Sequence, residues 1–182
     1  METNLHAAFT GHRTYDGRGD AALRALLDAM YARGFRTFLS GMAVGFDLAA
    51  AEAVLALRSR CSDVRLVAVI PFAEQERFYT PRDRARYAEA VARAYERVVL
   101  RPAYGPGCYR VRNDFLVEHA DEVVAWYDGS TGGTRYTVGR ALRLGLRVRN
   151  LCPEGPVLSA PAPAPAPALT LFCAPAPALT LF

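Results

Sequence analysis

The feature that most constrains the fold is an alternation of short apolar runs with amphipathic segments across the first 152 residues. The apolar runs have strand length and lie at 5–9, 37–39, 65–70, 98–100, 122–126 and 147–151. Between them, apolar side chains recur at helical spacing, most clearly at Leu23, Leu26, Leu27 and Met30. Strands that alternate with helices are typical of βαβ units. We therefore expect a single-domain α/β fold, a Rossmann-like open, mainly parallel sheet with helices on both faces.

The chain divides by composition into a Rossmann-like domain at 1–152 and an Ala/Pro-rich, low-complexity tail at 153–182. No charged residue follows Glu154, and Ala-Pro repeats favour an extended polyproline II conformation over a packed element. The segment Ala-Pro-Ala-Pro-Ala-Leu-Thr-Leu-Phe occurs at 164–172 and again at 174–182. It is either duplicated low-complexity sequence or a docking tail that adds to a sheet edge.

Charge and composition limit the kinds of partner that this protein is expected to bind. The net charge is +4, and all 22 basic residues are arginines spread along the chain, which argues against a nucleic-acid partner. No apolar run approaches the roughly 20 residues of a membrane span, and the first residues do not resemble a signal peptide. We expect a cytoplasmic protein with no membrane partner. The cysteines and histidines are dispersed, so the sequence indicates no metal site and no cofactor.

Candidate ligand-binding residues follow the predicted strands. Parallel strands end at a shared edge of the sheet, and ligands bind there at the topological switch point. We therefore expect loops that are distant in sequence to meet around one cleft, together with an Arg-Asn pair in the helix after the Gly105-Pro106-Gly107 break. The predicted lining residues are Gly11, His12, Arg13, Ser40, Gly41, Gly45, Asp47, Pro71, Gln75, Arg112, Asn113, Asp128, Gly132, Gly133 and Thr134.

Gly132 and Gly133 precede a helix that is expected to begin near Thr134. Glycines let the backbone approach a ligand closely, and the free N–H groups of a helix N-terminus attract anions. The pair is therefore either a phosphate cradle, with Arg13 as a further phosphate contact, or a tight strand-to-helix turn that needs glycine for its own geometry.

Two carboxylates are candidates for catalysis. Asp47 stands where a helix should begin, so it is either the helix N-cap or an acceptor for ribose hydroxyls. Glu52 follows five residues later, and it is either a solvated helix charge or a second candidate for acid–base chemistry.

Taken together, these loops resemble one known family. The residues that carry the resemblance are Phe9-Thr10-Gly11-His12-Arg13, Ser40-Gly41-Met42-Ala43-x-Gly45-x-Asp47-Leu48, Pro71-Phe72-x-x-Gln75, Arg112-Asn113 and Tyr127-Asp128-Gly129-x-x-Gly132-Gly133-Thr134. They resemble the YpsA-like proteins of the SLOG superfamily, which groups SMF/DprA proteins with the Lonely-Guy phosphoribohydrolases. The resemblance implies a Rossmann-like fold, a homodimer, and a pocket for a nucleotide or a derivative such as NAD or ADP-ribose.

One departure weakens the enzymatic reading. The Lonely-Guy motif Pro-Gly-Gly-x-Gly-Thr-x-x-Glu ends in a catalytic glutamate, and Thr137 occupies that position here. We therefore expect a nucleotide-binding ligand sensor. The alternative is an enzyme that cleaves an N-glycosidic bond with Asp47 or Glu52 as its carboxylate. A third reading, a DprA-type single-stranded DNA protein, is disfavoured by the modest charge and by the lack of an evident aromatic and basic stacking platform.

Overall fold

Six parallel strands form one sheet in the order β4-β3-β2-β1-β5-β6. The computed structural model describes residues 4–158. The strands are β1 (Leu5–Gly11), β2 (Phe35–Ser40), β3 (Arg65–Ile70), β4 (Glu96–Val99), β5 (Glu122–Trp126) and β6 (Arg147–Asn150). The expected open parallel sheet is confirmed.

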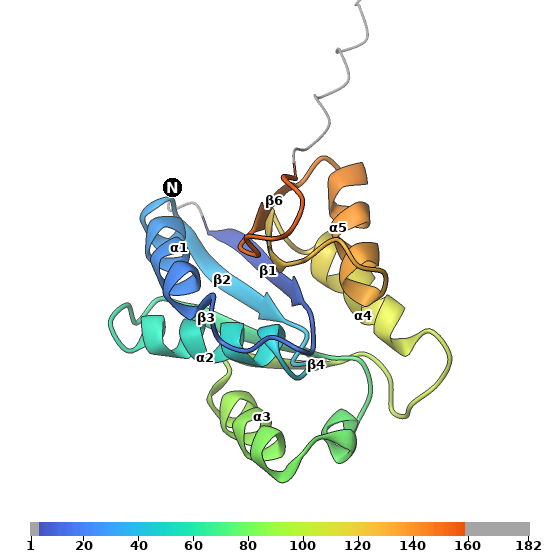
Figure 1. Ribbon diagram of the computed structural model, residues 1–182. Coiled ribbons are helices and arrows are strands. Elements are labelled where there is room, and N and C mark those ends of the chain that lie inside the picture. The colour runs from blue at the N-terminus through green and yellow to red at the C-terminus, as the bar shows by residue number, and fades with distance from the viewer. Residues whose placement is uncertain (1–3, 159–182) are drawn as a thin grey trace, which may run out of the picture.

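Helices cover both faces of this sheet (Figure 1). One layer holds α1 (Asp20–Ala32), α2 (Phe46–Arg58) and α3 (Pro81–Arg93), with a short 3-10 helix η1 (Gln75–Phe78) before α3. The other layer holds α4 (Cys108–Glu118) and α5 (Gly133–Arg143). No helix within residues 4–158 is long and apolar enough to cross a membrane.

The two layers bury different parts of the core. Aromatic rings fill the space under α2: Phe9 packs against Phe38 at 6.1 Å and edge-on against Phe46 at 6.4 Å between ring centroids. On the other face, β5 and β6 pack against α5 through Val123, Val138 and Val148. Burial on both sides explains why the central strands read as continuous apolar runs.

The strand order places the switch point between β1 and β5. From β1 the chain builds outward through β2, β3 and β4, and then returns to pair β5 with the opposite edge of β1. The loops after β1 and β5 therefore diverge to opposite faces of the sheet and leave a crevice between them.

Three local features differ from the sequence expectation. β4 begins at Glu96 rather than at residue 98, since this edge strand is mostly exposed and carries a weak apolar pattern. The helix η1 was not predicted. Asp47 is not the N-cap of α2, because Gly45 takes that position with a φ of +85° and α2 begins at Phe46.

The start of the predicted tail lies against the domain. Glu154 pairs with Arg18 at 2.8 Å, and Asn150 Nδ2 donates to the Pro156 carbonyl at 3.2 Å. Leu158 packs against the core beside β6. The repeated segments at 164–172 and 174–182, and Cys173 between them, lie outside the described residues.

Candidate ligand-binding site

A cavity of about 310 Å³ opens at the carboxyl ends of β1 and β5, at the switch point of the sheet. Its walls come from the loops after β1, β2 and β5 and from the starts of α4 and α5. The lining residues are Thr10, Gly11, His12, Arg13, Ala43, Asp47, Tyr109, Arg112, Asn113, Thr131, Gly132, Gly133 and Thr134. The volume is at the lower end of the range for small-molecule sites.

The N-terminus of α5 forms one wall of this cavity. Gly132 caps the helix with a φ of +134°, a backbone conformation that favours glycine. The first backbone hydrogen bond of the helix runs from the Tyr136 N–H to the Gly132 carbonyl. The N–H groups of the three residues before Tyr136 thus have no helical acceptor, and the first turn holds no acidic side chain. This wall carries the positive end of the helix dipole.

Arg112 joins the two sides of the cavity. Its side chain is buried; Nε donates to Asn113 Oδ1 at 2.7 Å, and Nη1 donates to the Gly41 carbonyl. Asn113 Nδ2 reaches the Gly133 carbonyl at 3.5 Å, so the network ends at the start of α5. A Cβ on Gly41 would lie 2.0 Å from Arg112 Nη1, which explains the glycine there.

Asp47 is the one carboxylate among the described residues that line the cavity. Its side chain is 5% exposed, and Oδ2 lies 3.6 Å from Arg112 Nη1. Burial raises the pKa of Asp47 to about 6, although the charges of Arg112 and Arg13 and backbone N–H groups oppose the shift. A carboxyl with this pKa exchanges its proton close to neutral pH.

The loop after β1 contributes His12 and Arg13. His12 Nε2 lies 2.9 Å from Asp128 Oδ1, which ties the β1 loop to the β5 loop. Asp128 itself is half exposed and stands outside the lining residues; hydrogen bonds from Ser130 and the nearby His12 lower its pKa. The Arg13 side chain is exposed, and its guanidinium carbon lies 5.5 Å from the centre of the Tyr109 ring.

Ser40 and Gln75, two other predicted lining residues, lie outside the cavity and stabilise the loop that forms one of its walls. Ser40 Oγ donates to the Asp47 carbonyl at 2.8 Å and accepts from the Met42 N–H. Gln75 Nε2 donates to the Met42 carbonyl at 3.1 Å, and Pro71 is buried at the end of β3. Ser40 and Gln75 thus hold the β2–α2 loop, in which Met42 has a φ of +55°.

Gly41, Gly45 and Glu52 also lie outside the cavity. Gly45 packs against the β1 loop, and a Cβ there would be 2.5 Å from the His12 carbonyl oxygen. Glu52 is on the outer side of α2, where it forms an ion pair with Arg86 at 2.7 Å. The structure therefore separates the two candidate carboxylates: Asp47 lines the cavity, and Glu52 does not.

Sequence reasoning missed Tyr109, which lines the cavity at the start of α4. Its ring packs edge-on against Phe72 at 5.7 Å and lies 6.4 Å from Tyr104, which is 57% exposed. Its position just after the Gly105-Pro106-Gly107 break could have indicated a loop-exposed ring. Tyr109 and Arg13 therefore place one aromatic ring and one guanidinium group next to each other at the cavity.

An open parallel sheet with a cavity at its switch point, walled by a glycine-capped helix N-terminus, defines a Rossmann-like α/β protein. The chain belongs to the YspA SLOG family, whose model (YpsA) matches residues 20–146. The predicted family resemblance is confirmed. A UPF0398 protein of Halalkalibacterium halodurans is 30% identical over 108 residues, which are 58% of this chain and 57% of that protein. YpsA of Bacillus subtilis is 28% identical over 66% of this chain and 68% of its own.

Solved structures of DNA processing protein A share the fold. The protein from Streptococcus pneumoniae aligns with a TM-score of 0.56 and 22% identity over 80% of this chain and 49% of its own. The protein from Helicobacter pylori aligns with a TM-score of 0.57 and 20% identity over 80% of this chain and 64% of its own, and is described by its single-stranded DNA binding mode. Our expectation against a nucleic-acid partner is therefore wrong, because the same fold serves single-stranded DNA binding in that protein.

Proposed function

We propose that the cavity at the switch point binds a nucleotide or a nucleotide-derived molecule such as ADP-ribose or NAD, and that the protein acts as a ligand sensor in the cytoplasm. The observation that carries this proposal is the N-terminus of α5, whose free N–H groups and dipole face a cavity that also holds Arg112 and Arg13.

Each part of such a ligand has a matching group in the cavity. Phosphate oxygens would accept from the N–H groups at the start of α5 and from the Thr134 hydroxyl. A base would stack on the Tyr109 ring beside the Arg13 guanidinium. Asp47 would accept from a ribose hydroxyl when ionised.

Asp47 also supports a second candidate function, cleavage of an N-glycosidic bond. Its pKa of about 6 suits a general acid, and it lines the same cavity. Thr137, at the position of the Lonely-Guy glutamate, is buried and donates to the Gly133 carbonyl at 2.9 Å. If there is turnover, Asp47 is the residue that would carry it.

The first experiment is a thermal-shift titration with ADP-ribose, NAD, AMP and ribose 5-phosphate. A ligand at about 100 times its Kd should add about 2.7 kcal/mol to the free energy of unfolding, on the order of several degrees in Tm. The double variant Gly132→Val/Gly133→Val should lose the shift. Gly139→Ala, further along α5, is the matched control and should keep it.

The outcomes separate the candidate functions. A shift with any of these ligands that the double variant abolishes supports the proposal. Release of base from AMP, abolished in Asp47→Asn, moves the assignment to the enzyme. A cooperative melt that none of the four ligands shifts contradicts the nucleotide site, and a 5′-phosphorylated single-stranded oligonucleotide is then the next probe.

A further inference from the structure

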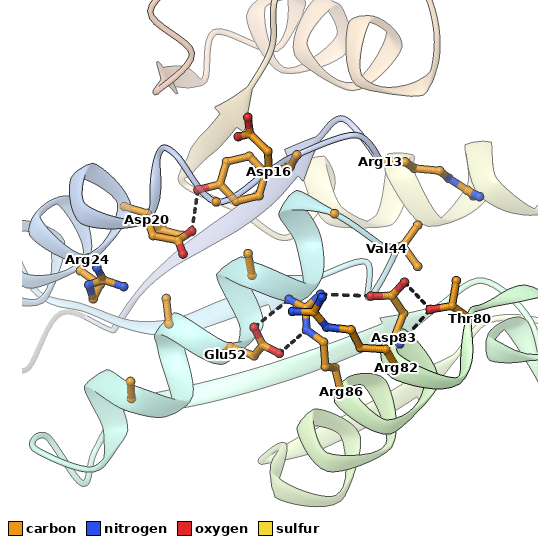
Figure 2. Close-up of a pocket in the computed structure, with 17 residues that line it drawn as sticks. Arg13, Asp16, Asp20, Arg24, Val44, Glu52, Thr80, Arg82, Asp83 and Arg86 are labelled. Atoms are coloured by element: carbon orange, nitrogen blue, oxygen red, sulfur yellow. Dashed lines mark hydrogen bonds and ion pairs between the residues drawn. The ribbon is translucent and has the colours of Figure 1, made fainter.

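A second cavity, of about 810 Å³, forms a groove beside the one at the switch point. Figure 2 shows this groove between α1, α2 and α3, with Arg24 on the α1 side and Arg82 and Arg86 on the α3 side. Apart from Arg13, none of its lining residues takes part in the function proposed above.

The groove runs along α2 away from the edge of the sheet. Its floor follows Gly45, Ala49, Ala53 and Ala56 on successive turns of the helix. With a rise of 1.5 Å per residue, this path is about 16 Å long. The methyl side chains leave room between α1 and α3, and the length exceeds what a single phosphate or a ribose would fill.

Most of the acidic groups in the groove already have partners. Arg86 donates to Glu52 at 2.7 and 2.8 Å and to Asp83 at 3.1 Å. Asp20 accepts from the Tyr15 hydroxyl at 2.6 Å. Asp16 accepts from the Arg18 backbone N–H at 3.2 Å and lies 3.7 Å from the Arg18 guanidinium Nε.

Three arginines of the groove, in contrast, have no ion-pair partner among residues 4–158. They are Arg13 at the mouth, Arg24 on α1 and Arg82 on α3. Guanidinium groups without an ion-pair partner stand on both walls and can take up a phosphate, because arginine binds phosphate through two parallel hydrogen bonds.

The groove and the switch-point cavity share a rim. Arg13 lines both of them. Gly45, at the mouth of the groove, packs directly on the backbone of His12 and Arg13, since a Cβ there would lie 2.5 and 2.6 Å from their carbonyl oxygens. The packed backbone therefore divides the two cavities below this rim, and a ligand that spans both would cross between them at the Arg13 side chain.

We propose that the groove holds the second half of a dinucleotide, so that the ligand of this protein carries two phosphates separated by a nucleoside. The first phosphate lies at the N-terminus of α5, and the second lies between Arg24 and Arg82. This inference rests on the proposed nucleotide site, which supplies the first anchor.

The test is isothermal titration calorimetry of the full chain with AMP and with the 5′-phosphorylated dinucleotide pApA. The groove variants are Arg24→Ala, Arg82→Ala and Ala53→Phe, which fills the floor; Arg147→Ala, an exposed arginine on β6, is the control. Arg24 and Arg82 are exposed, so replacing either with alanine should leave the melting temperature unchanged.

We expect pApA to bind at least about tenfold more tightly than AMP, the scale of one charge-assisted hydrogen bond. The three groove variants should remove this advantage and leave the affinity for AMP within about twofold of the wild type. Arg147→Ala should change neither affinity.

Equal affinity for AMP and pApA, with no effect of the groove variants, would overturn the groove assignment and leave the nucleotide site standing. No binding of either compound would overturn both. The ligand could be a free dinucleotide or the 5′ end of a nucleic-acid strand, and a 5′-phosphorylated oligoadenylate of ten residues distinguishes them. If it binds as tightly as pApA, the ligand is a strand end. If it binds more weakly, the ligand is a free dinucleotide.

Discussion

Replacement of Gly45 should strain the backbone where the β1 and β2 loops meet. Its φ is +85°, and a Cβ would lie 2.5 Å from the His12 carbonyl oxygen, a backbone atom that cannot turn away. We expect Gly45→Ala to lower the free energy of unfolding by about 1–3 kcal/mol. Denaturant unfolding of the variant measures this cost.

Gly139 provides the matched control for Gly45. It lies within α5, and a Cβ there would be 3.4 Å from the flexible end of the Arg143 side chain. Gly139→Ala should therefore be neutral or stabilise by up to about 1 kcal/mol. If both variants lowered the free energy of unfolding by the same amount, the close approach of the β1 and β2 loops would be contradicted.

Asp47 should make stability depend on pH in an unusual direction for a carboxylate. Folding raises its pKa from the ordinary 3.8 to about 6, so between these values the native state keeps a proton that the unfolded chain has lost. The contribution of Asp47 to stability is therefore fully present below about pH 4 and is lost as the pH rises to about 6.

Comparison with Asp47→Asn isolates this effect, because asparagine does not titrate. Relative to the variant, the wild type should lose on the order of 1–3 kcal/mol between about pH 4 and pH 6. Denaturant unfolding at several pH values measures the difference. A constant difference across this window would mean that Asp47 is ionised throughout in the native state.

At the scale of elements, Glu122, the first residue of β5, links β6 and the residue that follows α1. It is 2% exposed, and it accepts from Arg33 at 2.8 Å and from Arg149 at 2.9 Å. Burial alone would raise the pKa of Glu122, but the hydrogen bonds from the two arginines outweigh burial and lower it. Its stabilising contribution is thus present above its ordinary pKa and is lost as the pH falls through the lowered value.

We expect Glu122→Gln to destabilise the fold by about 1–3 kcal/mol, because one buried carboxylate serves two cationic donors. Ligand affinity should not change, since Glu122 lies at the opposite end of β5 from the cavity. Glu89→Gln, which breaks an exposed pair with Arg93 on α3, is the control and should cost less than about 0.5 kcal/mol. Urea unfolding and a ligand titration on the same samples check both points.

At the scale of the whole molecule, truncation tests where the domain ends. A chain that ends at residue 158 keeps every lining residue of both cavities and the contacts of Glu154 and Pro156. It should melt like the full chain and bind ligand equally well. Ending the chain at 152 removes those contacts and the packing of Leu158, which should cost about 1–2 kcal/mol.

The homodimer implied by the family resemblance is also a property of the whole molecule and stays a prediction. Light scattering after size exclusion tests it directly, with and without ligand.

The sequence by itself determined the order and type of the strands and long helices, because apolar periodicity records burial on one or both faces of each element. It also brought most of the lining residues to one edge, since the carboxyl ends of parallel strands must share it. Tertiary structure alone decided which side chains face the cavity. Asp47 and Glu52 lie five residues apart on one helix, but α2 turns the first toward Arg112 and the second toward Arg86. Tyr109 and Arg13 meet only in the folded chain, and the groove along α2 likewise forms only there. Such contacts depend on packing that no local pattern encodes.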